Sequence, residues 1–147
     1  MTIQSKPYGQ IEISDRQVIT FPVGIFGFEN LHKYALLDTG QPPFYWLQSL
    51  DETAIAFIIM NPYVFRPDYV LDVSGEDLDA IDYETDEDIL VFAIVTIPEE
   101  ESRMSANLQG PVIINRVRQL GHQAISLNQS WKTKHFIMDE LEHAGAR

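Results

Sequence analysis

The sequence contains no cysteine. This absence excludes disulfide bonds, zinc sites built on thiolates and thiol nucleophiles, and it is consistent with a reducing compartment. Long apolar runs are also missing, since none approaches the roughly 18 residues that a membrane-spanning helix needs. Residues 1–6 lack the apolar core of a signal peptide. The sequence therefore predicts a soluble, cytoplasmic protein with no membrane partner.

Basic residues are scarce and unevenly distributed. The chain has 10 lysines and arginines against 22 aspartates and glutamates, which gives a formal net charge of -12. Between Arg66 and Arg103 there is no lysine or arginine, yet thirteen acidic residues lie there. Nucleic acid is therefore not expected as a direct partner, because phosphate contacts require clustered cations. A basic protein is the natural complement, although acidic residues also simply keep a small domain soluble.

Residue patterns typical of enzymes are missing as well. The Gly24–Gly27 segment has neither the spacing nor the following lysine of a phosphate-binding loop. Acidic neighbours such as Asp86–Asp88 are crowded, but crowding on a solvated surface does not make a tuned acid–base pair. The sequence therefore predicts no catalytic residue, no cofactor and no metal site, and we do not expect an enzyme. The histidines are too far apart for a two-histidine metal site: His32, His122, His135 and His143.

Short apolar stretches separated by turn residues dominate the chain. Apolar residues make up 45% of the 147 residues, which suits one folded domain over residues 1–147. The stretches are rich in β-branched and aromatic side chains, which is typical of strands. The pattern predicts an all-β fold, a small antiparallel β-barrel or roll with one or two short helices, over 74–81 and 133–144. The predicted strands are a hairpin over 3–13 and single strands at 18–21, 34–37, 44–49, 54–60, 89–97, 112–115 and 123–127.

Residues 89–115 are the stretch around which the chain is organised. Ile89–Ile97 is almost wholly apolar and is stopped by Pro98, which predicts a strand buried on both faces. Three glutamates follow, and Met104–Pro111 then leads into a second apolar run at Val112–Asn115. We expect this acidic excursion from the core to lie at or near the functional site.

A second unusual segment, Phe21–Glu29, interleaves glycine and proline with large apolar residues. Glycine permits positive φ, so the segment predicts a tight apolar loop. The aromatic side chains of Phe26 and Phe28 either lie exposed at an interface or fold over the barrel as plugs. The sequence does not favour one over the other.

Several motifs together resemble one known family, the flagellar assembly factor FliW. The resemblance covers about residues 1–135, and residues 136–147 look like a C-terminal extension that includes part of the second helix candidate. The chain departs from the family's usual residues by having Phe26 for proline, Ser105 for threonine and Gly110 for alanine. The motifs are Phe21–Glu29, Phe44–Ser49, Asn61–Pro62, Val95–Pro98, Met104–Asn115 and Gly121–Leu127.

This resemblance implies a non-enzymatic, cytoplasmic regulator of bacterial flagellum biogenesis. FliW-like proteins bind CsrA, a small dimeric RNA-binding protein that represses flagellin translation, and they also bind flagellin in the manner of a chaperone. Export of flagellin releases FliW, and released FliW relieves the repression by CsrA. The family fold is a small antiparallel β-barrel or roll, in agreement with the predicted strands.

The acidic excursion and the glycine-rich loop supply the residues that we expect to bind a partner. Apolar side chains should anchor the complex while carboxylates steer a basic protein toward it. Asn107 either contacts the partner or ties its own loop. The predicted partner-binding residues are Ile25, Phe26, Phe28, Glu99, Glu100, Glu101, Met104, Asn107, Leu108 and Pro111.

One alternative belongs to a different functional class. Trp46, Trp131 and nearby aromatic residues could line a pocket for a carbohydrate or another small ligand. Such a barrel would need a deep cavity with convergent polar groups.

Overall fold

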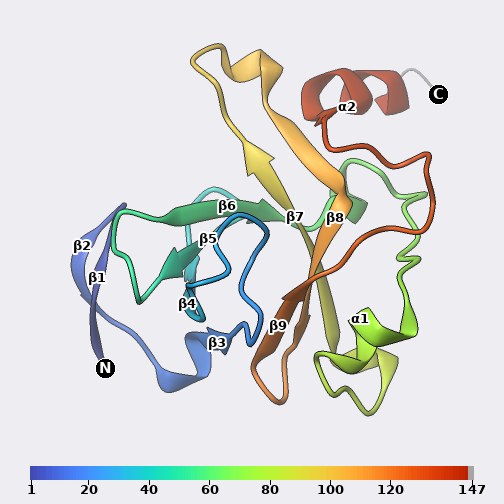
Figure 1. Ribbon diagram of the computed structural model, residues 1–147. Coiled ribbons are helices and arrows are strands. Elements are labelled where there is room, and N and C mark those ends of the chain that lie inside the picture. The colour runs from blue at the N-terminus through green and yellow to red at the C-terminus, as the bar shows by residue number, and fades with distance from the viewer. Residues whose placement is uncertain (146–147) are drawn as a thin grey trace.

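The computed structural model describes the backbone of residues 1–145 and the side chains of residues 1–142. Figure 1 shows a protein built mainly of strands, with its short helices outside the sheet. No helix in the described part is long and apolar enough to cross a membrane. The strands are β1 (Thr2–Ser5), β2 (Gly9–Glu12), β3 (Val18–Thr20), β4 (Lys33–Asp38), β5 (Phe44–Ser49), β6 (Ala56–Met60), β7 (Ile89–Thr96), β8 (Ser105–Asn115), β9 (Leu120–Gln123) and β10 (His135–Phe136), and the α-helices are α1 (Gly75–Asp79) and α2 (Ile137–Gly145).

Seven of the strands close into a barrel. They follow the order β8-β7-β6-β5-β4-β3-β9, and β9 pairs again with β8. The neighbours are antiparallel except for β3 and β9, which are parallel where Thr20 lies opposite Leu120. The predicted all-β barrel with short helices is confirmed, and this one parallel pairing is a departure from a purely antiparallel sheet.

The barrel is filled by side chains from most of its walls. Phe21, Tyr34, Leu47, Ile59 and Ile114 are completely buried there. The rings of Phe21 and Tyr34 meet edge to face with their centroids 5.1 Å apart, an arrangement that aromatic quadrupoles favour. Removing this apolar surface from water is the main force that holds the barrel together.

A second apolar layer covers the outer face of β7 and β8. Ala93 of β7 and Leu108 of β8 pack there with Trp131 and Ile137 from the C-terminal part of the chain. Phe92, the neighbour of Ala93, instead contributes to the core inside the barrel. The prediction that β7 is covered on both faces is therefore confirmed, and the same layer docks α2 onto the barrel.

The excursion after β7 is shorter than the sequence suggests. The expectation that Met104–Pro111 leaves the sheet is wrong, because β8 begins immediately after Met104 and only residues 97–104 form the loop. The start of β8 pairs with the end of β7 on one side and with β10 on the other. β10 is so distant in sequence that local patterns do not reveal this partner. The same pairing shortens the helix predicted at 133–144, which begins only at Ile137.

The last predicted strand also differs. β9 includes only the first residue of the predicted 123–127 strand. The following residues leave the ladder, and the backbone N–H groups of Ala124 and Ser126 donate to the carbonyls of Pro111 (2.8 Å) and Gln109 (2.7 Å). These bonds form where β8 bulges out of register with β7, a backbone irregularity that leaves no clear residue pattern.

Tyr34 carries a hydroxyl that is buried without a hydrogen-bond partner among the described residues. Replacing Tyr34 with phenylalanine is expected to raise the free energy of unfolding by about 1 kcal/mol, because an unpaired buried polar group is costly. Burial, with a smaller contribution from the charge of Asp51, also raises the pKa of Tyr34 to about 12. As the pH rises, Tyr34 therefore ionises in the unfolded chain before it does so in the folded protein. The wild type loses stability between about pH 10 and about pH 12.

Chemical unfolding of the two proteins at pH 7 and at pH 11 measures both effects. The difference in the free energy of unfolding between the phenylalanine variant and the wild type should be larger at pH 11, because the variant has no tyrosine at this position to ionise. A variant that is less stable at pH 7 would show that the hydroxyl has a favourable partner.

Candidate protein-interaction site

An open groove of about 470 Å³ lies beside the β7–β8 loop. Its floor is apolar and is formed by Phe44 and Trp46 of β5 and by Ile58 of β6. These side chains share one face because Trp46 pairs with Ile58 and side chains alternate along a strand. The rims come from the 97–104 loop and from Met138 of α2. We call this feature the α2 groove.

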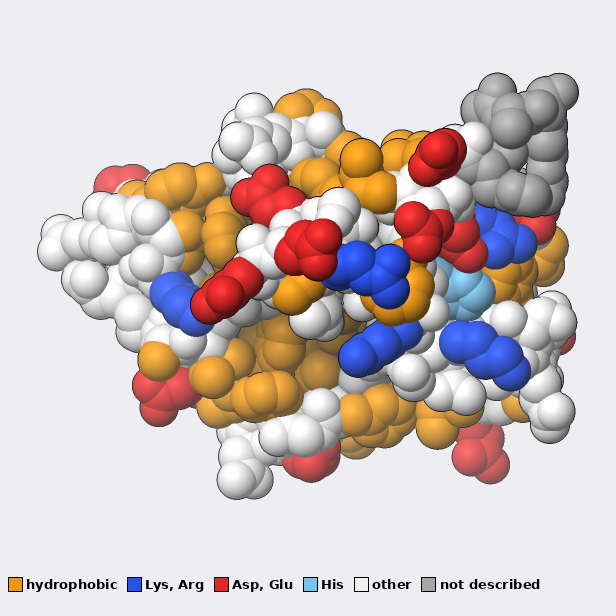
Figure 2. Space-filling model, turned by 90° about the horizontal axis from the view of Figure 1, so that it is seen from above, with side chains coloured by type: hydrophobic (Ala, Val, Ile, Leu, Met, Phe, Trp, Pro, Cys, Tyr) orange, Lys and Arg blue, Asp and Glu red, His pale blue; other side chains and the backbone are white. Residues whose placement is uncertain are grey.

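Three exposed glutamates, Glu99, Glu100 and Glu101, follow one another in the loop that forms one rim of the α2 groove. None of them forms an ion pair within the described part of the chain. Arg103 of the same loop lies 3.6 Å from Asp139 of α2 instead. Figure 2, which looks down on this end of the molecule, shows acidic side chains beside exposed hydrophobic ones. The rim therefore presents uncompensated negative charge next to an apolar surface.

The other acidic region, residues 72–88, is partly neutralised by cations from the β8–β9 turn. Arg118 contacts Asp82 at 2.8 Å, and Arg116 lies 3.8 Å from Asp88. Charges that already have a partner attract a second protein less strongly. The difference favours the rim glutamates as the charges available to a basic partner.

Two exposed apolar residues of the α2 groove were not foreseen from the sequence. Ile97 is 44% exposed and Met138 is 46% exposed, and both line the groove. The position of Ile97 at the end of a buried run, just before Pro98, was the available signal, because such a residue is the first to leave the core. Met138 directly follows the buried Ile137, and sequence alone does not show which of two adjacent helical residues faces inward.

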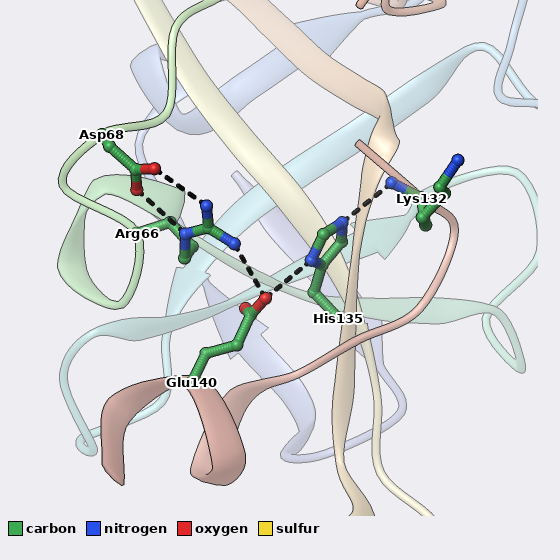
Figure 3. Close-up of polar contacts among 5 residues, drawn as sticks. All are labelled: Arg66, Asp68, Lys132, His135 and Glu140. Atoms are coloured by element: carbon green, nitrogen blue, oxygen red, sulfur yellow. Dashed lines mark hydrogen bonds and ion pairs between the residues drawn. The ribbon is translucent and has the colours of Figure 1, made fainter. Parts of the chain in front are cut away.

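A polar network fixes α2 against the barrel (Figure 3). Nη1 of Arg66 donates to Oε1 of Glu140 at 2.9 Å, while Nε and Nη2 of Arg66 donate to the carboxylate of Asp68. Nδ1 of His135 lies 2.8 Å from the same Glu140 oxygen. Nε2 of His135 accepts a hydrogen bond from the backbone N–H of Lys132 at 2.8 Å. The neutral imidazole therefore carries its proton on Nδ1 and donates it to Glu140.

Replacing Arg66 with alanine is expected to loosen α2. Hydrogen bonding to Asp68, and to a lesser extent to Glu140, raises the pKa of Arg66 against the opposing effect of burial, and the guanidinium also lies 4.7 Å over the ring of Trp131. We expect the free energy of unfolding to fall by about 1–3 kcal/mol, because the partly buried carboxylate of Glu140 loses the cation that contacts its Oε1. Faster hydrogen exchange in α2 is the measurement.

The matched control is Arg118→Ala, because Arg118 forms its ion pairs at the surface. Its effect on the free energy of unfolding should stay below about 1 kcal/mol. Equal exchange rates in α2 for wild type and the Arg66 variant would contradict a clamping role.

The glycine-rich loop packs into the barrel core and does not line the α2 groove. Ile25 is only 2% exposed within the core cluster, so the expectation that its side chain anchors a partner is wrong. Phe28 is half-buried and packs edge to face on Phe57 at 5.1 Å. Phe26 is 55% exposed, and its N–H donates to Oε1 of Gln123 at 3.0 Å. Partner binding by Phe26 and Phe28 stays a prediction.

The predicted anchors of the excursion separate into two groups. Met104 is half-buried and lines the α2 groove. Leu108 and Pro111 are buried, so the expectation of exposed anchors is wrong for these two, because β8 is covered by the second apolar layer. Oδ1 of Asn107 accepts hydrogen bonds from the backbone N–H groups of Gln109 (3.0 Å) and Gly110 (2.8 Å). Asn107 thus ties the bulge of β8, and its contact with a partner stays a prediction.

The two tryptophans do not meet in one pocket. Trp46 lines the α2 groove, whereas Trp131 is buried beneath the guanidinium of Arg66 and is absent from the groove wall. Within the described residues, no group of three or more histidine and acidic side chains is placed to hold a metal ion. The α2 groove therefore does not unite the two tryptophans that the small-ligand alternative names, and its open shape and apolar floor suit contact with another protein.

Comparisons with known proteins agree on one family. The family model described as "FliW protein" matches residues 2–137. The flagellar assembly factor FliW of Treponema denticola is 50% identical over 145 residues, covering 99% of both chains, and that of Treponema pallidum is 42% identical over 147 residues, covering 100% of this chain and 98% of the relative. A crystal structure of the flagellar assembly factor FliW superposes with a TM-score of 0.86 at 32% identity, covering 93% of this chain and 96% of that one.

Proposed function

Because the chain belongs to the FliW family of flagellar assembly factors, we propose that it is a cytoplasmic anti-CsrA protein that also binds flagellin. Free flagellin holds the protein, and export of flagellin releases it. The released protein binds CsrA and relieves the repression of flagellin translation. It acts as a single domain through contacts with these proteins and catalyses no reaction.

The uncompensated glutamates on the rim of the α2 groove are the observation that carries this proposal. A protein that holds RNA is basic along its RNA path, so long-range attraction steers it toward this rim. A like-charge contact at about 4 Å costs roughly 4 kcal/mol at an effective dielectric constant of about 20, and almost nothing beyond about 8–10 Å at physiological salt. The docked glutamates therefore exclude RNA only if they lie beside its path.

The apolar floor of the α2 groove provides the anchoring part of the interface. An amphipathic helix lays its apolar face into such grooves, and we assign an amphipathic segment of flagellin to this one. An apolar anchor of CsrA occupies the same floor in this proposal. The two partners then exclude one another, which is what a switch between them requires.

A displacement titration tests the proposal directly. Labelled flagellin leader RNA is bound to CsrA, and the protein is added with fluorescence anisotropy as the readout. RNA should leave CsrA as the protein saturates it, and added flagellin should restore RNA binding. RNA that stays bound at saturating protein would remove the anti-CsrA function.

Substituting aspartate for Ile97 or Met138 is expected to weaken binding of both partners by about 10-fold or more. Each side chain lines the groove while remaining nearly half exposed, so a charge there opposes an apolar anchor with little effect on the fold. The free energy of unfolding should change by no more than about 0.5 kcal/mol for Met138→Asp. Isothermal titration measures the affinities, and Leu127→Asp, which alters a 60% exposed residue outside the groove, is the control. Equal affinities for these variants would place the interface elsewhere.

A further inference from the structure

β7 is longer than the neighbour that covers one of its edges. β6 pairs only with residues 93–95 of β7, because β6 ends at Met60 and the chain turns away through a 3-10 helix at Pro62–Val64. Proline has no N–H to continue the ladder. Residues 89–92 pair with β8 on their other side. The stretch of β7 at 89–92, on the side where β6 has ended, is called here the open edge.

The alternation of hydrogen bonds along β7 identifies which backbone groups face the open edge. The N–H of Arg116 donates to the carbonyl of Asp88 at 2.9 Å, so Asp88 turns its backbone toward β8. Successive residues alternate in an antiparallel pair, so Leu90 and Phe92 also face β8. Ile89 and Val91 face the opposite way, toward the open edge. The N–H of Ile89 donates to the carbonyl of Asp86 in the preceding 3-10 turn. In the described part of the chain, no hydrogen bond outside the strand ladder engages the carbonyl of Ile89 or either backbone group of Val91.

A groove of about 450 Å³ runs along this edge. All four residues of the open edge line it, together with Tyr63, Leu71 and Leu78 on the facing side. Side chains from both faces of one strand line a single groove only where its edge is accessible. The groove therefore offers one unpaired backbone donor, the N–H of Val91, and two acceptors, the carbonyls of Ile89 and Val91, between apolar walls.

The surroundings of the open edge are acidic. Asp86 lines the groove, and Asp86–Asp88 immediately precedes the strand. No lysine or arginine occurs between Arg66 and Arg103. The cations that reach this region, Arg116 and Arg118, come from the end of β8 and the turn after it, on the side of β7 opposite the open edge. An occupant with basic side chains is electrostatically matched to this groove.

We propose that the open edge of β7 binds an extended polypeptide segment with alternating basic and apolar residues, added as a further strand. Both backbone groups of Val91 and the carbonyl of Ile89 pair with the segment, apolar side chains enter the groove, and basic side chains meet Asp86 and Glu87. Strand addition of this kind is a general mode of peptide recognition. The site shares no lining residue with the α2 groove, and it stands independently of the function proposed above.

Hydrogen exchange of the free protein is the first test. The amide of Val91 should exchange at least about 10-fold faster than those of Leu90 and Phe92, because only the latter two pair with β8. Equally slow exchange of all three would show that the edge is already closed and would overturn the proposal.

A capped peptide of sequence KVKVKVKV is the second test. It should slow the exchange of the Val91 amide by about 10-fold or more at saturation. The same peptide with its four central residues N-methylated, and the peptide EVEVEVEV, should not, since the first lacks backbone donors and the second has the wrong charge. Failure of KVKVKVKV to bind, or binding that leaves the exchange of the Val91 amide unchanged, would overturn the proposal.

Two double variants complete the design. Asp86→Lys with Glu87→Lys should weaken KVKVKVKV binding by about 10-fold, whereas Asp15→Lys with Glu52→Lys makes the same change in net charge at exposed positions outside this groove and should leave it within about twofold. Ile97→Asp in the α2 groove should not affect it either. If the Asp15 and Glu52 variant lost affinity for KVKVKVKV to the same extent, net charge alone would explain the effect. That result would overturn the proposed binding site.

Discussion

Replacing Leu108 with alanine is expected to lower the free energy of unfolding by about 2–5 kcal/mol. Leu108 is 0% exposed and packs in the apolar layer that joins β7 and β8 to Trp131 and Ile137. Truncation would leave a cavity between the barrel and α2, and tight packing there prevents a full collapse of the site. The backbone N–H of Leu108 also donates to the carbonyl of Lys132 at 3.0 Å, so the side chain cannot turn outward without breaking this contact.

Urea unfolding of the variant, with Leu127→Ala as the control, separates a core role from a partner-binding role. Leu127 is 60% exposed, so its truncation should change the free energy of unfolding by no more than about 0.5 kcal/mol. If Leu108→Ala were as stable as wild type and only lost affinity for CsrA, the side chain would be an exposed anchor after all, and the packing of β8 described above would not persist in solution.

Reversing the charges of Glu99 and Glu101 to lysine is expected to weaken CsrA binding by about 100-fold at physiological salt, which corresponds to about 2.8 kcal/mol. Two attractive contacts become repulsive, and neither glutamate has an ion-pair partner among the described residues. The dependence of affinity on salt should flatten, because fewer attractive charges remain to be screened. Titrations at several salt concentrations measure both quantities.

The matched control is the Asp15→Lys and Glu52→Lys variant, which alters net charge equally at positions outside the α2 groove. It should reduce affinity only slightly, since distant charges are screened beyond about 8–10 Å. A salt dependence that is the same for wild type and the Glu99 and Glu101 variant would mean that CsrA docks away from the rim.

Local signals in the sequence were sufficient to predict many of the elements. The strand predicted at 44–49 has the same bounds as β5, because its three consecutive aromatic residues and the leucine after them have high strand propensity or suit a half-buried sheet. The start of α1 follows from Ser74, whose hydroxyl accepts a hydrogen bond from the N–H of Asp77 at 3.1 Å. The barrel class followed from the number and shortness of the strands.

Features that depend on distant partners were beyond local reasoning. The start of β8 pairs with β10 as well as with β7, and Leu108 is buried by the apolar layer that includes Trp131 and Ile137. Arg66 and Glu140 are 74 positions apart, so nothing near either residue indicates the pair that fixes α2. The glutamate cluster was recognised as a candidate from composition, whereas the apolar floor beside it comes from β5 and β6 and becomes visible only in three dimensions.

The parallel pairing of Thr20 with Leu120 has a consequence for the newly made protein. Joining segments about 100 residues apart carries a loop-closure cost of about 4 kcal/mol, and the barrel wall is incomplete until β9 has left the ribosome. A nascent chain that ends before Gln123 therefore presents β3 and β8 with unsatisfied edges, which are prone to self-association. Release of full-length chains, and not the folding of early segments, is then the step at which this protein becomes safe from aggregation.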